Sequence, residues 1–336
     1  MVAATVGPPL ALCSVVMSID RSPPSEAWRA WPRERLEREY APSSCVPSIE
    51  PYLAARATRS EEALRALDVR PGLRYGDGPD ETLDLFPTGG AAAPLAVFFH
   101  GGYWQEPDRR DSLFPALGFV PNGVAYAAVG HALAPRATLA EIVDEARRSV
   151  AWLARNAREL GVDRRRLVVA GHSAGAHLAA MVLLTDWRTF ALPADTVRGG
   201  ILVSGVYDLE PLVATHLNDA LGLDAPTARA LSPRRSLPDA APVVTPVAPE
   251  ARLPVLLRRG TTPRVRLPAV VAWGSNETSE FRRQSVDFAA GWSALGHPVD
   301  VFEVPERNHF DVILDLGDPA TQLGAATYRL LGLRCG

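Results

Sequence analysis

Ser173 lies between glycines in the pattern Gly-x-Ser-x-Gly, which spans residues 171–175. A buried strand is predicted over 167–170, directly before this pattern, and an alanine-rich helix is predicted over 174–184, directly after it. A serine on such a sharp strand-to-helix turn needs small neighbours because the backbone there is strained. Small residues also occur at ordinary helix starts, but the strand–turn–helix context favours a nucleophile. The first N–H groups of the helix would direct partial positive charge at this serine.

A second group of chemically suggestive residues, His-Gly-Gly-Tyr-Trp, follows a predicted buried strand over 95–99. A glycine pair at a strand end lets backbone N–H groups face a ligand, so an oxyanion hole is expected here. An ordinary glycine turn covered by packed aromatic rings is the alternative for this segment taken alone. The residues expected to form the oxyanion hole are His100, Gly101, Gly102, Tyr103, Trp104 and Ala174. The residues expected to bind the substrate are Tyr103, Trp104 and His172, the two aromatic rings as a flat apolar wall.

A serine nucleophile needs a general base, and the base needs an acid that orients it. His309 is the candidate base because it follows the last predicted strand, over 299–304. Glu277 is the candidate acid because it lies on the loop after the strand predicted over 269–273, which gives the chain order serine, acid, histidine. Asp208 is the second candidate for the acid, and Asp311 is too close to His309 in sequence to be preferred. The sequence has no His-Glu-x-x-His pattern, so a zinc protease site is not supported.

The elements that must position these residues alternate between short apolar runs and helical patterns from about residue 82 onward. This alternation predicts an α/β fold with a mostly parallel sheet. Further strands are predicted over 82–86, 123–129 and 201–204. A capping box formed by Thr138 and Glu141 starts a helix that stops at Gly161. Ser279 is expected to cap a helix that ends at Gly296, and the last helix is expected over 319–331.

The composition narrows the class of protein. The chain has 336 residues, a net charge of −3 and 47% hydrophobic residues, which is typical of a globular protein and not of a nucleic-acid binder. All 35 basic residues are arginines, which excludes a Schiff-base lysine and a Walker-type phosphate loop. Three widely spaced cysteines do not suggest a disulfide framework, and a cytoplasmic location is expected.

Several segments depart from the alternating pattern. Residues 1–25 are expected to be a disordered leader, with Met17 as an alternative start, and residues 26–336 are expected to form a single domain. Residues 20–70 are polar and expected to be largely helical. A cap or insertion is expected over about 209–267, because a short helical stretch there is followed by a proline-dense run that cannot form a central strand.

The sequence resembles the serine-dependent arylformamidases, or kynurenine formamidases, of the α/β-hydrolase fold, over roughly residues 30–332. The resemblance rests on HGGYWQ (100–105), GHSAGAHLAAM (171–181), SGVYDLEPL (204–212), ETSEFRRQS (277–285) and NHFD (308–311). It implies Ser173 as the nucleophile, Glu277 as the acid, His309 as the base and 100–104 as the oxyanion segment. It also implies N-formyl-L-kynurenine, or a related N-formyl arylamine, as the substrate, with no metal or cofactor. The proline-rich stretch over about 234–266 looks longer than the corresponding link in the family.

Two other functions remain open at this point. A carboxylesterase of the same fold would use the same three residues on small esters. An inactive hydrolase fold that binds a ligand is disfavoured because nucleophile, base and oxyanion glycines are all present. No nucleic-acid or membrane partner is expected, and the sequence leaves the oligomeric state open, a homodimer included.

Overall fold

The computed structural model describes residues 26–90, 92–106, 109–239 and 265–333. Within these residues, strands form one eight-stranded sheet in the order β1-β2-β4-β3-β5-β6-β7-β8. The first two strands run antiparallel to their neighbours, and the other six are mutually parallel. The strands are β1 (Arg70–Arg74), β2 (Thr82–Phe86), β3 (Ala93–Phe99), β4 (Ala125–Val129), β5 (Val162–His172), β6 (Gly200–Val203), β7 (Ala269–Asn276) and β8 (Val299–Asn308).

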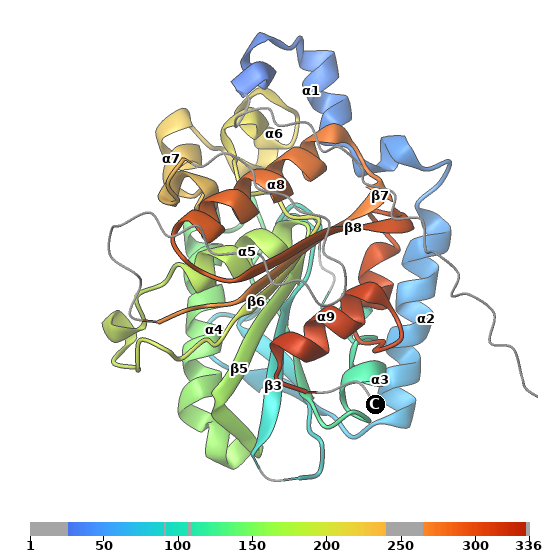
Figure 1. Ribbon diagram of the computed structural model, residues 1–336, viewed down its shortest axis with the longest axis vertical. Coiled ribbons are helices and arrows are strands. Elements are labelled where there is room, and N and C mark those ends of the chain that lie inside the picture. Colours follow the sequence, from blue (N-terminus) through green and yellow to red (C-terminus); the bar gives the residue numbers. More distant parts are fainter. Residues whose placement is uncertain (1–25, 91, 107–108, 240–264, 334–336) are drawn as a thin grey trace, which may run out of the picture.

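Helices cover both faces of this sheet, as expected for parallel strands joined by crossover helices (Figure 1). They are α1 (Arg33–Glu39), α2 (Glu50–Ala66), α3 (Ala116–Phe119), α4 (Leu139–Leu160), α5 (Ala174–Leu183), α6 (Asn218–Leu221), α7 (Ala225–Ala230), α8 (Ser279–Ala294) and α9 (Gln322–Leu330). Successive side chains of β3 enter opposite buried clusters. Val97 and Phe99 pack in the cluster that includes α4, α5 and α8, whereas Ala96 and Phe98 pack in the one that includes α3 and α9.

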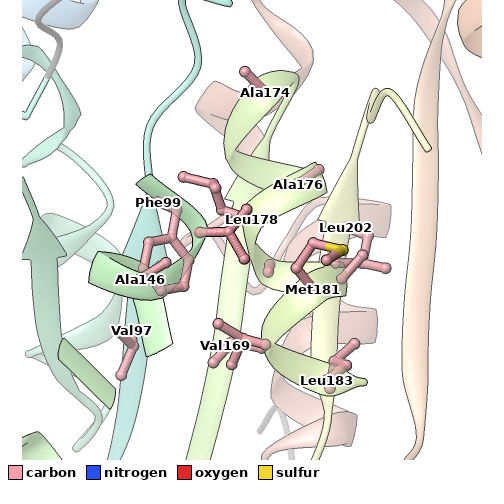
Figure 2. Close-up of a cluster of buried hydrophobic side chains, with 14 of the residues drawn as sticks. Val97, Phe99, Ala146, Val169, Ala174, Ala176, Leu178, Met181, Leu183 and Leu202 are labelled. Carbon is pink, nitrogen blue, oxygen red and sulfur yellow. The ribbon is translucent and has the colours of Figure 1, made fainter. Parts of the chain in front are cut away.

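The helix that follows Ser173 is buried along its whole length. Its residues belong to the same core cluster as Phe99, Val169 and Leu202 of three neighbouring strands. Figure 2 shows Leu178 and Met181 of α5 among the strand side chains of this cluster. The turn that carries Ser173 is therefore fixed from both sides, by a central strand before it and by a core helix after it.

The α/β class and the predicted elements are confirmed, with corrections at their ends. The Thr138–Glu141 capping box is present, and Gly161 ends α4 in the left-handed conformation. The N-cap of α8 is Thr278 rather than Ser279, and α9 begins at Gln322 rather than at Pro319. The sequence does not predict the edge strand β1, because its residues, RPGLR, are mostly exposed and show no apolar alternation.

Short helices lie above the ends of the parallel strands. The elements in the predicted cap region are η5 (Glu210–Ala214), α6, α7 and η6 (Pro233–Ser236), and the N-terminal η1 (Glu26–Ala30) packs beside them. Glu210 links the N-terminal η1 to the predicted cap region, since its buried carboxylate pairs with Arg29 at 2.5 Å and with Arg229 at 2.6 Å. The rest of the predicted insertion, 240–264, and the predicted leader, 1–25, lie outside the described residues, and the single domain over 26–336 stays a prediction.

Candidate active site

The candidate catalytic residues all lie just beyond the carboxyl ends of parallel strands. The His-Gly-Gly segment follows β3, Ser173 follows β5, Glu277 follows β7 and His309 follows β8. Because β3, β5, β6, β7 and β8 are consecutive in one parallel sheet, their carboxyl ends share one edge. Segments separated by more than 200 residues in the sequence are brought together there.

Ser173 occupies a strained turn. Its backbone has φ 56° and ψ −122°, a conformation that side chains with a Cβ rarely adopt. The two glycines of the motif are required by close approach. A Cβ at Gly175 would lie 1.9 Å from the Phe99 carbonyl oxygen, and one at Gly171 would lie 2.1 Å from the Gly175 carbonyl oxygen. The turn can form only when both positions lack a side chain.

His309 and Glu277 form a buried hydrogen-bonded pair. The Nδ1 of His309 lies 2.8 Å from Oε2 of Glu277, and their side chains are 5% and 1% exposed. A carboxylate can only accept here, so Nδ1 carries the proton and Nε2 is left free to accept one. The second oxygen of Glu277, Oε1, accepts from the Ser204 hydroxyl and from the Gly274 N–H, both at 2.6 Å.

His172 connects the serine turn to the histidine loop. Its Nε2–H donates to the backbone carbonyl oxygen of His309 at 2.8 Å, and the two rings are 4.7 Å apart. Burial, with the neighbouring His309 and Arg56, holds the pKa of His172 well below its usual range, so the ring is neutral. The expectation that His172 binds substrate stays a prediction; the residue is 3% exposed, and its Nε2–H is already engaged by the His309 carbonyl oxygen.

The His-Gly-Gly segment lies against the serine. A Cβ at Gly101 would be 3.2 Å from Cβ of Ser173. Gly102, Tyr103 and Trp104 then follow with φ of 95°, 49° and 58°, three consecutive left-handed residues. A tight turn of this kind can leave successive backbone N–H groups on one side, as an anion-binding loop requires.

The two aromatic residues of this segment have different surroundings. Trp104 is 0% exposed, and its ring packs edge-on against His177 of α5 at 4.9 Å. The expectation that Trp104 forms a substrate wall stays a prediction; in the structure its indole packs between the predicted oxyanion segment and α5. Tyr103 is only half-buried, and its hydroxyl donates to the Tyr40 carbonyl oxygen at 2.6 Å.

Asp208, the second candidate for the acid, pairs with Arg235 at 2.9 Å in the ion-pair cluster around Glu210. Asp311 accepts a hydrogen bond from the backbone N–H of Asn308 and so shapes the loop that carries His309. The structure therefore places Glu277, and neither aspartate, against the histidine ring.

The other histidines have structural surroundings. Burial lowers the pKa of His100 to about 3 and that of His177 to about 4, so both are neutral. His131 stacks on His100 at 4.4 Å. His216 pairs with Glu37 on the surface, and His297 packs on Trp292. Of the seven histidines, the one that the structure pairs with a carboxylate in the interior is His309.

Two residues beside the site had no sequence signal of their own. The sequence predicts Ser204 as the last residue of the strand over 201–204 and as the first residue of a family-like segment, whereas in the structure it directly follows β6 at the catalytic edge. Tyr40 lies in the N-terminal segment, and its partners at positions 103, 280 and 284 are far away in sequence. Position after a parallel strand could have suggested Ser204; nothing local could have suggested Tyr40.

In the part of the chain that the structure describes, we find no cluster of three or more His, Cys, Asp or Glu side chains arranged to hold a metal ion. Nor does any helix among those residues have the length and apolar character needed to cross a membrane.

The mostly parallel eight-stranded sheet, with a serine on a strained turn between a central strand and a core helix, defines an α/β-hydrolase. Residues 83–196 match the BD-FAE family model. A solved structure of a proposed thioesterase from a Silicibacter species covers 86% of this chain and 97% of its own, with a TM-score of 0.70 and 28% identity.

Two curated relatives extend over most of the chain. The kynurenine formamidase of Danio rerio is 30% identical over 313 residues, which is 91% of this chain and 98% of the fish protein. The kynurenine formamidase of Salmo salar is 31% identical over 314 residues, with the same coverage. The chain belongs to the kynurenine formamidase family, and it is a hydrolase.

Proposed function

We propose that this chain is an arylformamidase that hydrolyses N-formyl-L-kynurenine, or a closely related N-formyl arylamine, to the free arylamine and formate. The observation that carries the chemistry is the buried 2.8 Å pair of His309 and Glu277 beside the strained turn of Ser173. The similarity over nearly the full length of two kynurenine formamidases supports the choice of substrate.

In the proposed reaction, Ser173 is the nucleophile, His309 the general base and Glu277 the acid that orients it. The free Nε2 of His309 takes the hydroxyl proton while the serine oxygen attacks the formyl carbon. Backbone N–H groups near Gly102 and at Ala174 hold the oxyanion that forms. His309 then gives the proton to the leaving arylamine nitrogen, and the C–N bond breaks.

A formyl-serine ester remains after the arylamine has left. Water, deprotonated by His309, attacks this ester, and formate and the free serine are released. Glu277 stays ionised throughout and stabilises the imidazolium that His309 becomes in each half-reaction. The mechanism needs only groups of this chain and water.

Two further assignments belong to this proposal. If N-formyl-L-kynurenine is the substrate, the product is L-kynurenine, and the reaction is a step of tryptophan catabolism. We place the enzyme in the cytoplasm. Among the described residues Cys45 has no disulfide partner, which supports this placement because unpaired cysteines are typical of reducing compartments.

The test is formate release from a fixed arylamine that carries formyl, acetyl or butyryl groups, with the matching aryl esters in parallel. A formamidase needs little room on the acyl side, so kcat/KM should fall steeply from formyl to butyryl. The Ser173→Ala variant gives the background rate. Equal or better turnover of butyryl esters would assign the chain to the small-ester carboxylesterases instead.

A further inference from the structure

Ser204 makes a contact on which the candidate acid depends. It follows β6, the strand between those that carry Ser173 and Glu277, and it is 0% exposed. Its hydroxyl donates to Oε1 of Glu277 at 2.6 Å, while the backbone N–H of Gly274 donates to the same oxygen at 2.6 Å. The other oxygen, Oε2, is thereby directed to Nδ1 of His309.

The backbone at Ser204 is unfavourable for a serine. Its φ is +50°, in the left-handed region where a residue with a Cβ is strained and glycine is not. Its own N–H donates to the Ala272 carbonyl oxygen at 2.8 Å, which holds the backbone in this position. Glycine would satisfy the same backbone conformation without strain, so the serine must contribute something that its backbone does not.

We propose that Ser204 is a positioning residue of the catalytic site, one that acts through Glu277 and not on the substrate. The inference rests on the proposed roles of Glu277 and His309. A glutamate side chain has three rotatable bonds, and the Gly274 N–H alone fixes only one point of its carboxylate. With Ser204, two donors, one after β6 and one in β7, converge on Oε1 and hold that oxygen in place, so that Oε2 faces the His309 ring and sets its tautomer and direction.

This role predicts a defect in the chemical step with little effect on substrate binding. Without the hydroxyl, the carboxylate loses one of its three hydrogen bonds and can rotate about the remaining ones. Loss of one hydrogen bond to a charged group corresponds to a fall of roughly ten- to hundredfold in kcat. KM should stay within about twofold because Ser204 does not contact the substrate.

The experiment uses two substitutions at one position and one matched control. Ser204→Ala removes the hydroxyl and keeps the strain, whereas Ser204→Gly removes both. Ser285 is the control, since it is also 0% exposed and, among the described residues, its hydroxyl has no hydrogen-bond partner. Formate release gives kcat and KM, thermal unfolding gives Tm, and the low-field proton resonance of the His309 Nδ1–H reports the contact with Glu277 directly.

Both Ser204 variants should lose the same activity although Ser204→Gly has the higher Tm, and both should shift or broaden the His309 resonance. Ser285→Ala should leave kcat and the resonance unchanged. The inference is wrong if Ser204→Gly keeps full activity, because the loss in Ser204→Ala would then come from backbone strain and not from the missing hydroxyl. It is also wrong if Ser204→Ala changes neither kcat nor the resonance.

Failure of the proposed function would look different. A wild-type protein that releases no formate from any N-formyl arylamine removes the substrate assignment but leaves the contact measurable. In that case the resonance, and the rate at which a fluorophosphonate probe labels Ser173 in the wild type and in Ser204→Ala, decide the role of Ser204.

Discussion

Replacement of Glu277 by glutamine tests the assignment of the acid most directly, because the structure determines how the new amide must lie. The Gly274 N–H can only donate, and it points at Oε1 together with the Ser204 hydroxyl. The amide oxygen must therefore occupy the Oε1 position, and the NH2 group must face Nδ1 of His309. An NH2 group donates, so Nδ1 has to accept, and the ring proton moves to Nε2.

This tautomer cannot act as a base toward Ser173. Restoring the proton to Nδ1 would set two donors against each other in a buried site, at a cost of about 1–3 kcal/mol. The imidazolium that forms during the reaction would also lack its carboxylate, and removing one partner of a buried ion pair costs about 3–5 kcal/mol. Together these effects amount to at least about 4 kcal/mol, or at least a ~10³-fold fall in kcat.

The matched control is Asp208→Asn, because Asp208 is a second buried carboxylate at the same edge of the sheet, 5% exposed, and pairs with Arg235 at 2.9 Å. Its loss should lower Tm and leave kcat within about threefold, since Arg235 does not orient His309. Formate release measured with folding checked by circular dichroism compares the two. If Asp208→Asn is the more damaging with the fold intact, or if Glu277→Gln stays within tenfold of wild type, the acid has been misassigned.

Three further outcomes can be checked with the same protein. Ser173→Ala and His309→Ala should each lower kcat by on the order of 10⁴-fold, and the double variant should be no worse, because the residues act as a unit; additive losses in steady-state kinetics would contradict this. Gly175→Ala should lower the free energy of unfolding, measured by urea titration, by more than about 3 kcal/mol, because the new Cβ would lie 1.9 Å from the Phe99 carbonyl oxygen. The control Gly90→Ala should change this free energy little, because the atom nearest to its new Cβ is 3.8 Å away. Burial lowers the pKa of His177 from 6.5 to about 4, so between these pH values the unfolded chain binds more protons than the folded one. The free energy of unfolding should therefore fall as the pH drops from about 6.5 to about 4. His177→Gln can keep the hydrogen bond to the Leu231 carbonyl oxygen and should make this pH dependence less steep.

The sequence alone predicted the features that depend on neighbouring residues, such as helix ends and the residues that follow buried strands. The Thr138–Glu141 capping box and Gly161 predicted both ends of α4, because caps are satisfied by neighbours within one turn. The order of predicted strands placed Ser173 and His309 after buried strands, and parallel topology requires such positions to share one edge of the sheet. The structure places both residues at that edge.

Contacts between distant segments were decided only by the tertiary structure. The choice between Glu277 and Asp208 depends on which carboxylate contacts His309. In the sequence both residues follow predicted strands of the parallel sheet, so the sequence does not decide between them. The orientation of Trp104 into the core could not be deduced either, because an aromatic residue after a glycine pair fits a core or a binding wall equally well.

Most of the hydrogen bonds that hold the site together join segments that are far apart in the sequence. Ser204 reaches Glu277 across 73 residues, and His172 reaches the His309 backbone across 137. Sequence periodicity reports which face of an element is buried, and caps report where the element ends. Which polar groups meet above the sheet depends on the order and register of its strands, which the chain sets only when the whole core is packed.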